Sequence, residues 1–318
     1  MNHPSDDNSN TSDSGKKPQP LTKTMDVTKS LEAMEDELAS GKQRSISYLV
    51  VLAGDSPGQV IRLERNCQLR AGRDPDCDLF FDCDNVSREH AVFLLDNAGR
   101  TRITDLDSTN GTLVNGKRVD SQKLDDGDRI CLGNVILRFC YKDGLEFDFQ
   151  QNLYDKATRD PLTCVYNKRF FTEALEREMA FHSRHEHPLS ILIIDLDNFK
   201  RVNDSFGHLN GDIVLKTLGN LFRQQMRTED TFARFGGEEF VGMLRNTPKD
   251  QALRVAEKLR EMIAAMSFAT THDNFSVTAT IGVATLIDKN YDSTEAILMA
   301  ADNNLYIGKS RGRDMVIG

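Results

Sequence analysis

The spacing of the apolar residues changes once along this chain, and that change limits the folds it can adopt. From residue 45 to residue 141 they occur in short runs, such as SISYLVVLA, AVFLLD and VILRFCY, with turn sequences such as GDSPG and DSTNGTLVNG between them. Short strands about ten residues apart, bounded by turn residues, are typical of an all-β sandwich. We therefore predict a β-sandwich over residues 44–141.

A second pattern begins after Pro161. NKRFFTEALEREMAFHSRH has apolar residues at helical spacing, whereas PLSILIIDLD is a continuous apolar run, as in a buried strand. Along the rest of the chain, three further helical stretches alternate with the hairpin pattern TFARFGGEEFVGML and the strand pattern FSVTATIGVATLI. This order predicts an α+β domain over residues 160–318. The chain is thus predicted to be multidomain.

Two further segments complete the predicted organisation. Residues 1–20 contain no Val, Ile, Leu, Ala or aromatic residue, so we expect residues 1–43 to be a disordered tail. Within it, apolar residues from Val27 to Leu38 at helical spacing indicate either a short helix or a partly helical linker. Residues 142–159, between the two predicted domains, are expected to form a connecting helix.

Composition excludes several classes of protein. No apolar run reaches the ~18 residues that a membrane span requires, and MNHPSDDNSN lacks the basic start and apolar core of a secretory signal. The six cysteines form no CxxC pair, which argues against a zinc site, and the net charge of −9 disfavours nucleic-acid binding. We expect a cytoplasmic protein with reduced cysteines and no membrane span.

The sequence RFGGEEF places two acids directly after two glycines. Gly236 and Gly237 are expected to form a two-residue hairpin turn, since glycine accepts the positive φ angles of such turns. Acids also end the apolar run of IIDLD, at Asp195 and Asp197. Carboxylates that emerge together from buried strands need a compensating charge, and a divalent cation is the usual one. A solvated rim of the sheet, without metal, is the alternative.

Longer motifs surround these acids. IDLDNFKRVNDSFGHLNGD matches the pattern DxDxFKxxNDxxGHxxGD in full. RDPLTCVYNKRFF resembles DxLTxLxNRR, and ADNNLYIGKSRGRD resembles ADxALYxAKxxGRN. Residues about 156–318 therefore resemble the GGDEF family of diguanylate cyclases, in the GGEEF variant, which implies a palm-like α+β nucleotide-cyclase fold. The departures from the family pattern are Cys164, Val165, Lys168, Asn303, Asn304, Gly308 and Asp314.

The resemblance implies a bacterial signalling enzyme, a nucleotidyltransferase that joins two GTP molecules into cyclic di-GMP and releases two pyrophosphates. Each protomer has one GTP site, so a homodimer is expected. The implied metal site, for Mg²⁺ or Mn²⁺, consists of Asp195, the carbonyl of Leu196, Glu238 and Glu239. The implied catalytic residues are Glu238, Glu239 and Lys200. The implied GTP site consists of Asn203 and Asp212 for the guanine, and Phe199, Lys200, Lys309 and Arg313 for the phosphates. Asp197 is either a structural acceptor or catalytic, and His208 is expected to be structural.

A product-inhibition site is also implied by the family. Arg227 and Asp230 match its RxxD motif, in which the arginine holds the product guanine and phosphate and the aspartate accepts from the base. The bare pattern recurs elsewhere in the chain, so its position, with Asp230 six residues before Gly236, carries the assignment. A basic residue of the next helix, Arg254, Lys258 or Arg260, is a candidate to complete the site.

The first domain resembles a forkhead-associated domain, on GR at 72 and 73, SREH at 87–90 and DLDSTNGTLVNG at 105–116. Such domains bind phosphothreonine peptides. The resemblance implies that Arg73 binds the phosphate, that Ser87, Arg88 and Thr109 add hydrogen bonds, and that Asn110 holds the peptide backbone. It also implies that His90 is buried scaffold and that Asn115 and Gly116 form a turn. A sandwich that binds no peptide is the alternative.

The phosphothreonine that this domain would bind has two possible sources. One is the chain's own tail, phosphorylated by a Ser/Thr kinase at Thr11, Thr22, Thr24 or Thr28; the other is a phosphorylated partner protein. Tethering raises the effective concentration of a tail peptide to roughly millimolar. For the whole protein, the alternative to a regulated cyclase is a catalytically inactive cyclic di-GMP receptor and phosphopeptide adaptor. Retention of both glycines, the acids and the phosphate-binding cations favours the enzyme.

Overall fold

The computed structural model describes residues 45–318, with gaps at 55, 186, 228, 271–273 and 287–290. The chain divides into two units, Met1–Arg44 and Ser45–Gly318, and only the second is described. The expected tail, its helix and the candidate sites Thr11, Thr22, Thr24 and Thr28 therefore lie outside the described residues. Within the described part of the chain, no helix is both long and apolar enough to span a membrane.

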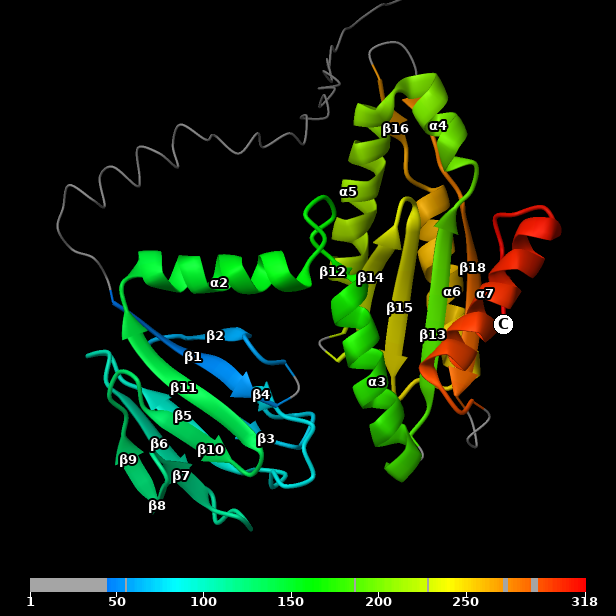
Figure 1. The fold of residues 1–318 in the computed structure, drawn as a ribbon. Coiled ribbons are helices and arrows are strands. Elements are labelled where there is room, and N and C mark those ends of the chain that lie inside the picture. Colours follow the sequence, from blue (N-terminus) through cyan, green and yellow to red (C-terminus); the bar gives the residue numbers. More distant parts are fainter. Residues whose placement is uncertain (1–44, 55, 186, 228, 271–273, 287–290) are drawn as a thin grey trace, which may run out of the picture. The chain divides into compact units, whose positions relative to one another are not determined.

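Two mainly antiparallel sheets form the sandwich of the first domain (Figure 1). One has the strand order β2-β1-β11-β10-β7-β8 and the other β4-β3-β5-β6-β9, in which β3 and β4 run parallel. The bounds are β1 Ile46–Ala53, β2 Val60–Leu63, β3 Cys67–Gly72, β4 Leu79–Phe80, β5 Ala91–Leu95, β6 Thr101–Asp105, β7 Thr112–Val114, β8 Lys117–Val119, β9 Ser121–Lys123, β10 Arg129–Leu132 and β11 Val135–Lys142.

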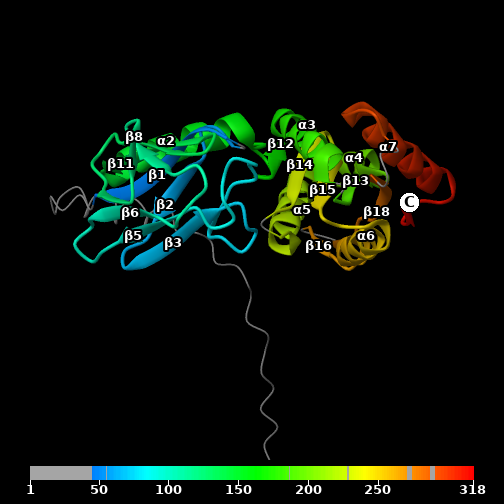
Figure 2. The same cartoon turned by 90° about the horizontal axis from the view of Figure 1, so that it is seen from below.

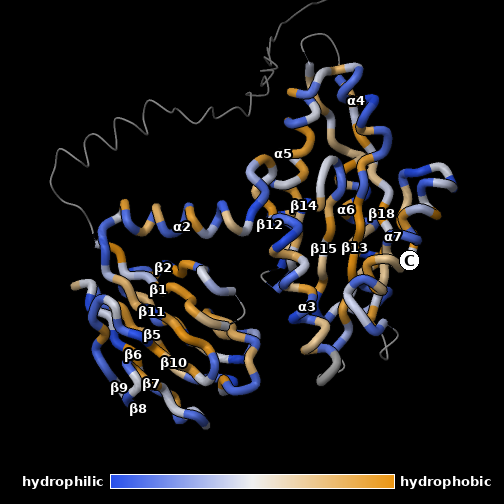
Figure 3. Tube along the Cα trace, viewed as in Figure 1, coloured by the Kyte–Doolittle hydropathy of each residue, from blue (hydrophilic) through white to orange (hydrophobic). Residues whose placement is uncertain are grey.

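The core of this sandwich lies between the inner faces of the two sheets. One apolar cluster contains residues from both sheets. Four of its members have no exposed surface: Leu49, Ile103, Ile130 and Leu137. Neighbouring strand residues point to opposite faces, and one face of each sheet fills this cluster. Hydrophobic colours predominate along the central strands (Figure 3), because the other face of β1 also carries buried residues, Tyr48 and Val50. The predicted all-β sandwich is confirmed.

A helix, α2 Gly144–Thr158, follows the sandwich in the chain. Asp143 caps it by accepting a hydrogen bond from the backbone N–H of Glu146. Tyr154 and Thr158 are buried on one side, and Phe147 packs edge-to-face on Tyr48 of β1. The apolar side chains on the remaining surface of the helix, Leu145, Phe149 and Leu153, are exposed.

The second domain has one mixed sheet between two layers of helices (Figure 2). Its strand order is β12-β14-β15-β13-β18-β19. A separate two-stranded sheet pairs β16 Phe268–Ala269 with β17 Asn274–Phe275. The strands of the main sheet are β12 Tyr166–Asn167, β13 Leu189–Leu196, β14 Thr231–Gly236, β15 Glu239–Arg245, β18 Ala279–Leu286 and β19 Val316–Ile317. The helices are α3 Lys168–His185, α4 Phe199–Phe206, α5 His208–Gln225, α6 Lys249–Ala264 and α7 Thr294–Ser310.

Each face of the main sheet has its own apolar core. Leu192 and Ile194 of β13 pack with residues of α5 and α6 in one cluster, whereas Ile191 and Ile193 pack with residues of α3 and α7 in the other. β13 is buried on both faces, which explains why PLSILIIDLD is apolar without interruption. The predicted α+β class is confirmed, with one addition: the separate helix α4 was not predicted and carries three of the expected GTP-binding residues, Phe199, Lys200 and Asn203.

Candidate active site and phosphopeptide site

The ends of β13 and β15 bring two of the expected acids together. Asp195 of β13 lies directly opposite Glu239 of β15 and Thr280 of β18 in the strand registers. Residues directly opposite in a pair have their side chains on the same face of the sheet. Asp195 shares the face of Ile193, which α3 and α7 cover. The two acids therefore stand on the α3–α7 side of the sheet.

The hairpin turn between β14 and β15 differs from the expected one. β14 ends at Gly236, which pairs with Glu239, so the two turn residues are Gly237 and Glu238. The prediction that both glycines form the turn was wrong, because an irregularity between Arg234 and Gly236 shifts the register. Gly237 takes the first, positive-φ position, with φ +51°. Glu238 thus lies in the turn itself, while Glu239 begins the next strand.

The turn is fixed by an arginine that the sequence patterns did not single out. Arg234 donates from Nε and Nη2 to the carbonyl of Gly237, at 2.9 and 2.7 Å. Its Nη1 donates to Asp160 at 3.2 Å, and Asp160 also accepts from the N–H and hydroxyl of Thr163. Burial would raise the pKa of Asp160, but the Thr163 hydrogen bonds and the Arg234 charge hold it below its usual value. In the sequence, this contact is indicated by two residues: Asp160, the acid of the DxLT motif, and Arg234, the arginine directly before FGG.

The acids in this region repel one another and attract two lysines, Lys309 and Lys168. Burial raises the pKa of Asp195, and the charge of Glu238 raises it further, while Lys309 Nζ, 2.8 Å from its carboxylate, opposes both. Burial also raises the pKa of Glu239, with the charges of Asp195 and Asp302 adding to it. Asp302 was not predicted to lie here. A site that already crowds negative charge is suited to a cation.

The oxygen donors at the end of β13 and in the β14–β15 turn determine which metal ion this site could hold. Among the described residues, no group of three or more His, Cys, Asp or Glu side chains is arranged to hold a metal ion. Mg²⁺ at a nucleotide site typically takes one or two carboxylates and completes its shell with phosphates and water. Asp195 and Glu238, with the carbonyl of the buried Leu196, supply a set of this kind. The residues present therefore fit an ion that binds together with a nucleotide.

The expected guanine-binding residues lie at the junction of α4 and α5. A methyl group at Gly211 would lie 2.0 Å from Oδ1 of Asn203, so the two residues are in direct contact. Asp212 is the next residue of α5. The structure therefore packs Asn203 against the residue that precedes Asp212, and a Cβ at position 211 would force the Asn203 side chain to move.

The start of α4 carries the residues expected at the phosphates. Asn198, with φ +54°, turns the chain into the helix, and the buried Phe199 occupies its first position. Lys200 follows on the exposed surface. Backbone N–H groups at a helix start have no intrahelical partner and favour anions, which is consistent with the expected role of Phe199.

The alternative left open for Asp197 is decided by its contacts. Its side chain is buried and accepts hydrogen bonds from the hydroxyls of Thr278 and Thr280, at 2.7 and 2.6 Å, and from the backbone N–H of Asp314 at 3.0 Å. All of these contacts are structural, so Asp197 is a structural acceptor. The segment that it holds carries Arg313, which is exposed.

The expected product-inhibition residues lie at the other end of the β14–β15 hairpin. Asp230 accepts from the backbone N–H groups of Arg227 and Arg245, at 3.3 and 3.2 Å, and the Arg227 side chain is exposed. Burial raises the pKa of Asp230 to about 6. Of the basic candidates on α6, Arg254 pairs with Asp250, and Arg260 is engaged with Glu257 and Asp314.

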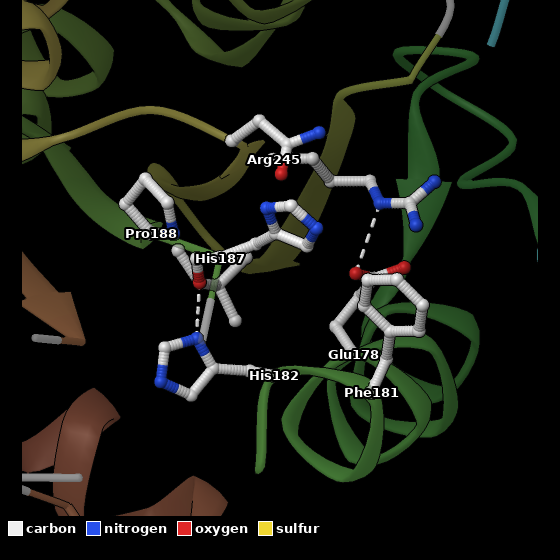
Figure 4. Close-up of a pocket in the computed structure, with 8 residues that line it drawn as sticks. Glu178, Phe181, His182, His187, Pro188 and Arg245 are labelled. Atoms are coloured by element: carbon white, nitrogen blue, oxygen red, sulfur yellow. Dashed lines mark hydrogen bonds and ion pairs between the residues drawn. The ribbon is translucent and has the colours of Figure 1, made fainter. Parts of the chain in front are cut away.

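Two cavities of the second domain lie away from these acids. Figure 4 shows a cavity of about 10 Å³ where Arg245 pairs with Glu178 at 2.9 Å and His182 contacts the carbonyl of His187. It is lined by Leu189 and Arg245, which pair at the opposite end of β13 and β15 from Asp195 and Glu239. A second cavity, of about 450 Å³, reaches Leu286 of β18, which also pairs with Leu189. Neither cavity contains an expected GTP-binding residue.

The expected phosphothreonine-binding residues converge at the loops of the sandwich. A Cβ at Gly72 would lie 2.0 Å from the carbonyl of Arg88, so glycine allows the loops of Arg73 and Arg88 to pack together. Arg73 Nη1 lies 3.3 Å from Asp84, and its side chain is about one-third exposed. Ser87 Oγ accepts from the backbone N–H of Thr109 at 3.0 Å.

Two further residues of this domain have defined contacts. His90 has no exposed surface; its Nδ1 accepts from the N–H of Ser87, which leaves Nε2 to donate to the carbonyl of Gly111. Burial lowers the pKa of His90, consistent with a neutral scaffold residue. Asn110 donates to the carbonyl of Asn85 at 2.8 Å, a contact within the domain that was not expected. The expected turn at Asn115 and Gly116 is present, with φ +52° and +79°.

Comparisons with known proteins agree with this arrangement. The family model described as "FHA domain" matches residues 69–133, and the model described as "Diguanylate cyclase, GGDEF domain" matches residues 157–315. The diguanylate cyclase DgcP of Pseudomonas aeruginosa is 41% identical over 169 residues, which are 52% of this chain and 25% of that protein. The response regulator PleD of Caulobacter vibrioides is 36% identical over 185 residues, 58% of this chain and 40% of that protein. The chain therefore spans less than half the length of these relatives.

Solved structures give the same result. The diguanylate cyclase SiaD of Pseudomonas aeruginosa, in complex with its activator SiaC, has a TM-score of 0.50 and 32% identity, covering 54% of this chain and 66% of that chain. The coiled coil and GGDEF domain of DgcB from Caulobacter crescentus, at 24% identity and a TM-score of 0.50, shares the fold. The resemblances to both domain families are confirmed. Since the cyclase model matches half of its length, this chain belongs to the diguanylate cyclase GGDEF domain family, with an FHA domain preceding the cyclase domain.

Proposed function

We propose that this protein is a diguanylate cyclase that joins two GTP molecules into cyclic di-GMP and releases two pyrophosphates. The observation that carries the proposal is the cluster of acids at the end of the central strands. Asp195 lies opposite Glu239, close enough to Glu238 for that charge to raise its pKa, and 2.8 Å from the cation of Lys309. Phosphoryl transfer needs positioning and charge neutralisation more than covalent chemistry.

Each residue has a role in this proposal. Mg²⁺ or Mn²⁺, held by Asp195, Glu238 and the Leu196 carbonyl, supplies charge neutralisation at the triphosphate. Glu238 also accepts the proton of the attacking 3′-hydroxyl, and Glu239 is the second acid of the site. Asn203 and Asp212 bind the guanine, since an amide and a carboxylate together match its donors and acceptor. The triphosphate is bound by the Phe199 backbone, Lys200, Lys309 and Arg313.

The active form is proposed to be a homodimer. The described part of each chain has a single set of these residues, whereas the product contains two guanylate units joined to each other. Two sites must therefore face one another during the reaction, and two copies of this chain supply them.

The direct test is product formation from GTP and Mg²⁺ by the full chain after bound nucleotide has been stripped. Stripping is required because product retained at the proposed inhibitory site would imitate an inactive enzyme. Cyclic di-GMP in the reaction supports the proposal. Its absence from stripped, dimeric protein, both alone and with a phosphorylated tail peptide, would favour the receptor function instead.

Product inhibition through Arg227 and Asp230 is proposed to weaken as the pH falls. The pKa of Asp230 is raised to about 6, so the carboxylate that accepts from the product guanine is ionised at pH 7.5 and mostly protonated at pH 5.5. We expect the dissociation constant of cyclic di-GMP to rise about fourfold over this interval in calorimetric titrations. Asp230→Asn removes the titrating group and should abolish this dependence. An equal pH dependence in the variant would contradict the assignment.

The FHA domain is proposed to bind a phosphothreonine peptide at Arg73, Ser87, Arg88, Thr109 and Asn110. The guanidinium of Arg73 is partly exposed, and Ser87 and Thr109 are already linked by a hydrogen bond. Arg73→Ala should weaken binding of a phosphothreonine peptide by about tenfold or more, since hydrogen bonds to a charged group each contribute ~1.5–3 kcal/mol. Fluorescence anisotropy with peptides around Thr11, Thr22, Thr24 and Thr28 measures this.

The control for this titration is Arg62→Ala, a surface arginine of β2 that pairs with Glu64. Binding that requires the phosphate and is lost only in Arg73→Ala supports the site. Binding of phosphorylated tail peptides supports regulation by the chain's own tail after kinase action. Phosphate-dependent binding of a partner protein without binding of the tail peptides would assign the ligand to the partner.

A further inference from the structure

The turn after α7 holds Arg313 in a backbone conformation that needs outside support. Arg313 and Asp314 have φ values of +69° and +47°, directly after Gly312 at +124°. For residues other than glycine, this left-handed conformation costs roughly 1–2 kcal/mol each. Such residues persist where the surrounding structure determines them. Two in succession, at the proposed triphosphate-binding cation, indicate that specific contacts hold the turn.

One contact comes from the segment after the central strand. Asp197, two residues after the proposed metal-binding Asp195, accepts from the backbone N–H of Asp314 at 3.0 Å. Thr278 and Thr280 donate to the same carboxylate and fix its orientation. The backbone of the turn is therefore tied to the strand that carries the metal-binding acid.

A second contact comes from α6 and holds the side chain of Asp314. Arg260 Nη1 lies 2.6 Å from Asp314 Oδ1, while its Nε and Nη2 donate to Glu257 at 2.9 and 2.6 Å. Arg260 is only 18% exposed, so its guanidinium is held in place at both ends. The family pattern has Asn at the position of Asp314, which carries no charge. The ion pair is thus a property of this chain and not of the family motif.

A third contact comes from the end of α7. The backbone N–H of Arg313 donates to the carbonyl of Gly308 at 3.1 Å, and Gly308 precedes Lys309. The turn therefore folds back on the helix end that carries the second phosphate-binding cation. Its conformation decides where the Arg313 side chain begins relative to Lys309.

We propose that Arg260 is a positioning residue for the triphosphate: by pairing with Asp314 it holds the turn of residues 312–314 in the left-handed conformation that presents Arg313 beside Lys309. The inference rests on the proposed cyclase function. Arg260 and Asp314 do not contact the nucleotide and act through Arg313. The guanine end of the site, at Asn203 and Asp212, is independent of this pair.

The test is binding of 3′-deoxy-GTP with Mg²⁺ to the full chain, measured by calorimetry. This analogue carries the triphosphate but lacks the attacking hydroxyl, so binding is measured without turnover. Arg260→Ala and Asp314→Ala should each weaken binding about tenfold, and the double variant no more than either, because the two residues act as one unit. Asp314→Asn keeps an acceptor for Arg260 and should lose less. Arg169→Ala breaks an exposed ion pair with Glu173 on α3 and is the control.

A second arm separates positioning from general destabilisation. In an Arg313→Ala background, Arg260→Ala should cause no further loss of binding, because the cation that it positions is absent. A further loss there would overturn the proposal, as would wild-type affinity in Arg260→Ala. If Arg260→Ala fails to fold, Asp314→Asn and Asp314→Ala give the same comparison. Failure of the wild-type chain both to bind 3′-deoxy-GTP and to form cyclic di-GMP would instead refute the proposed function itself.

Discussion

Replacing Glu238 by glutamine is expected to lower cyclic di-GMP formation by about 10³-fold. Loss of a metal-holding carboxylate removes several kcal/mol of charge stabilisation in the transition state, and each 1.36 kcal/mol is a factor of ten in rate. Glutamine has the size of glutamate, so the turn fixed by Arg234 and Gly237 should be unchanged. Initial rates from GTP and Mg²⁺, followed by chromatography of the product, measure the effect.

The thermal stability of Glu238→Gln, unlike its activity, should not fall. The charge of Glu238 raises the pKa of Asp195, which means that the two carboxylates repel each other when no metal is bound. Removing one charge should leave the melting temperature unchanged or raise it. Glu173→Gln, on the exposed surface of α3, is the matched control and should retain activity. Activity of Glu238→Gln within tenfold of the wild type would refute the assigned role.

Replacing Gly282 by alanine is expected to destabilise the cyclase domain by about 3 kcal/mol. Gly282 lies in β18, where a Cβ would be 2.1 Å from the carbonyl oxygen of Ala301 and 2.4 Å from the backbone nitrogen of Leu305. Both atoms belong to the backbone of α7, so no side chain can rotate away. The whole helix must shift, and with it Lys309, so catalytic activity should fall as well.

Gly144→Ala is the matched control for this substitution. Gly144 is the first residue of α2, and a Cβ there would lie 3.8 Å from Ile46, an ordinary contact. Alanine also has a higher helix propensity than glycine, so stability should not fall. Urea unfolding of both variants gives the comparison. A loss below about 1 kcal/mol for Gly282→Ala would show that α7 can move away from β18 at little cost.

The helix and strand patterns predicted the fold class because the residues that an element buries are apolar, and they recur with the period of that element. β13 has a continuous apolar run because both of its faces are covered. The same holds for β1, whose inner face lies in the sandwich core and whose Tyr48 packs on Phe147 of α2. The short helix α4 was not predicted by these patterns. Its sequence, FKRVNDSF, has few apolar residues, and its first residue, Phe199, is buried in the core that also contains residues of α5 and α6.

The expected nucleotide-site residues came from motifs, whereas the contacts that orient them came from the fold. Asp195 and Glu238 are far apart in sequence, and only the pairing of β13 with β15 brings the strand of Asp195 next to the turn that carries Glu238. The register shift that places Glu238 in the turn follows Arg234, whose guanidinium holds the Gly237 carbonyl and is itself bound by Asp160 from a distant part of the chain. No local pattern encodes such a contact, because its partners are set by the packing of whole elements.

The sequence alone determined the chemistry available to this protein: the acids, the cations that we propose bind phosphate, the glycines of the tight turns and the two domain families. Local turns such as Asn115–Gly116 were also determined locally, because their positive φ angles select those residues. Only the tertiary structure decided that Asp197 is a structural acceptor and that Arg260 holds Asp314. Both assignments depend on which side chains meet across the sheet and α6, and that is decided when the layers pack together.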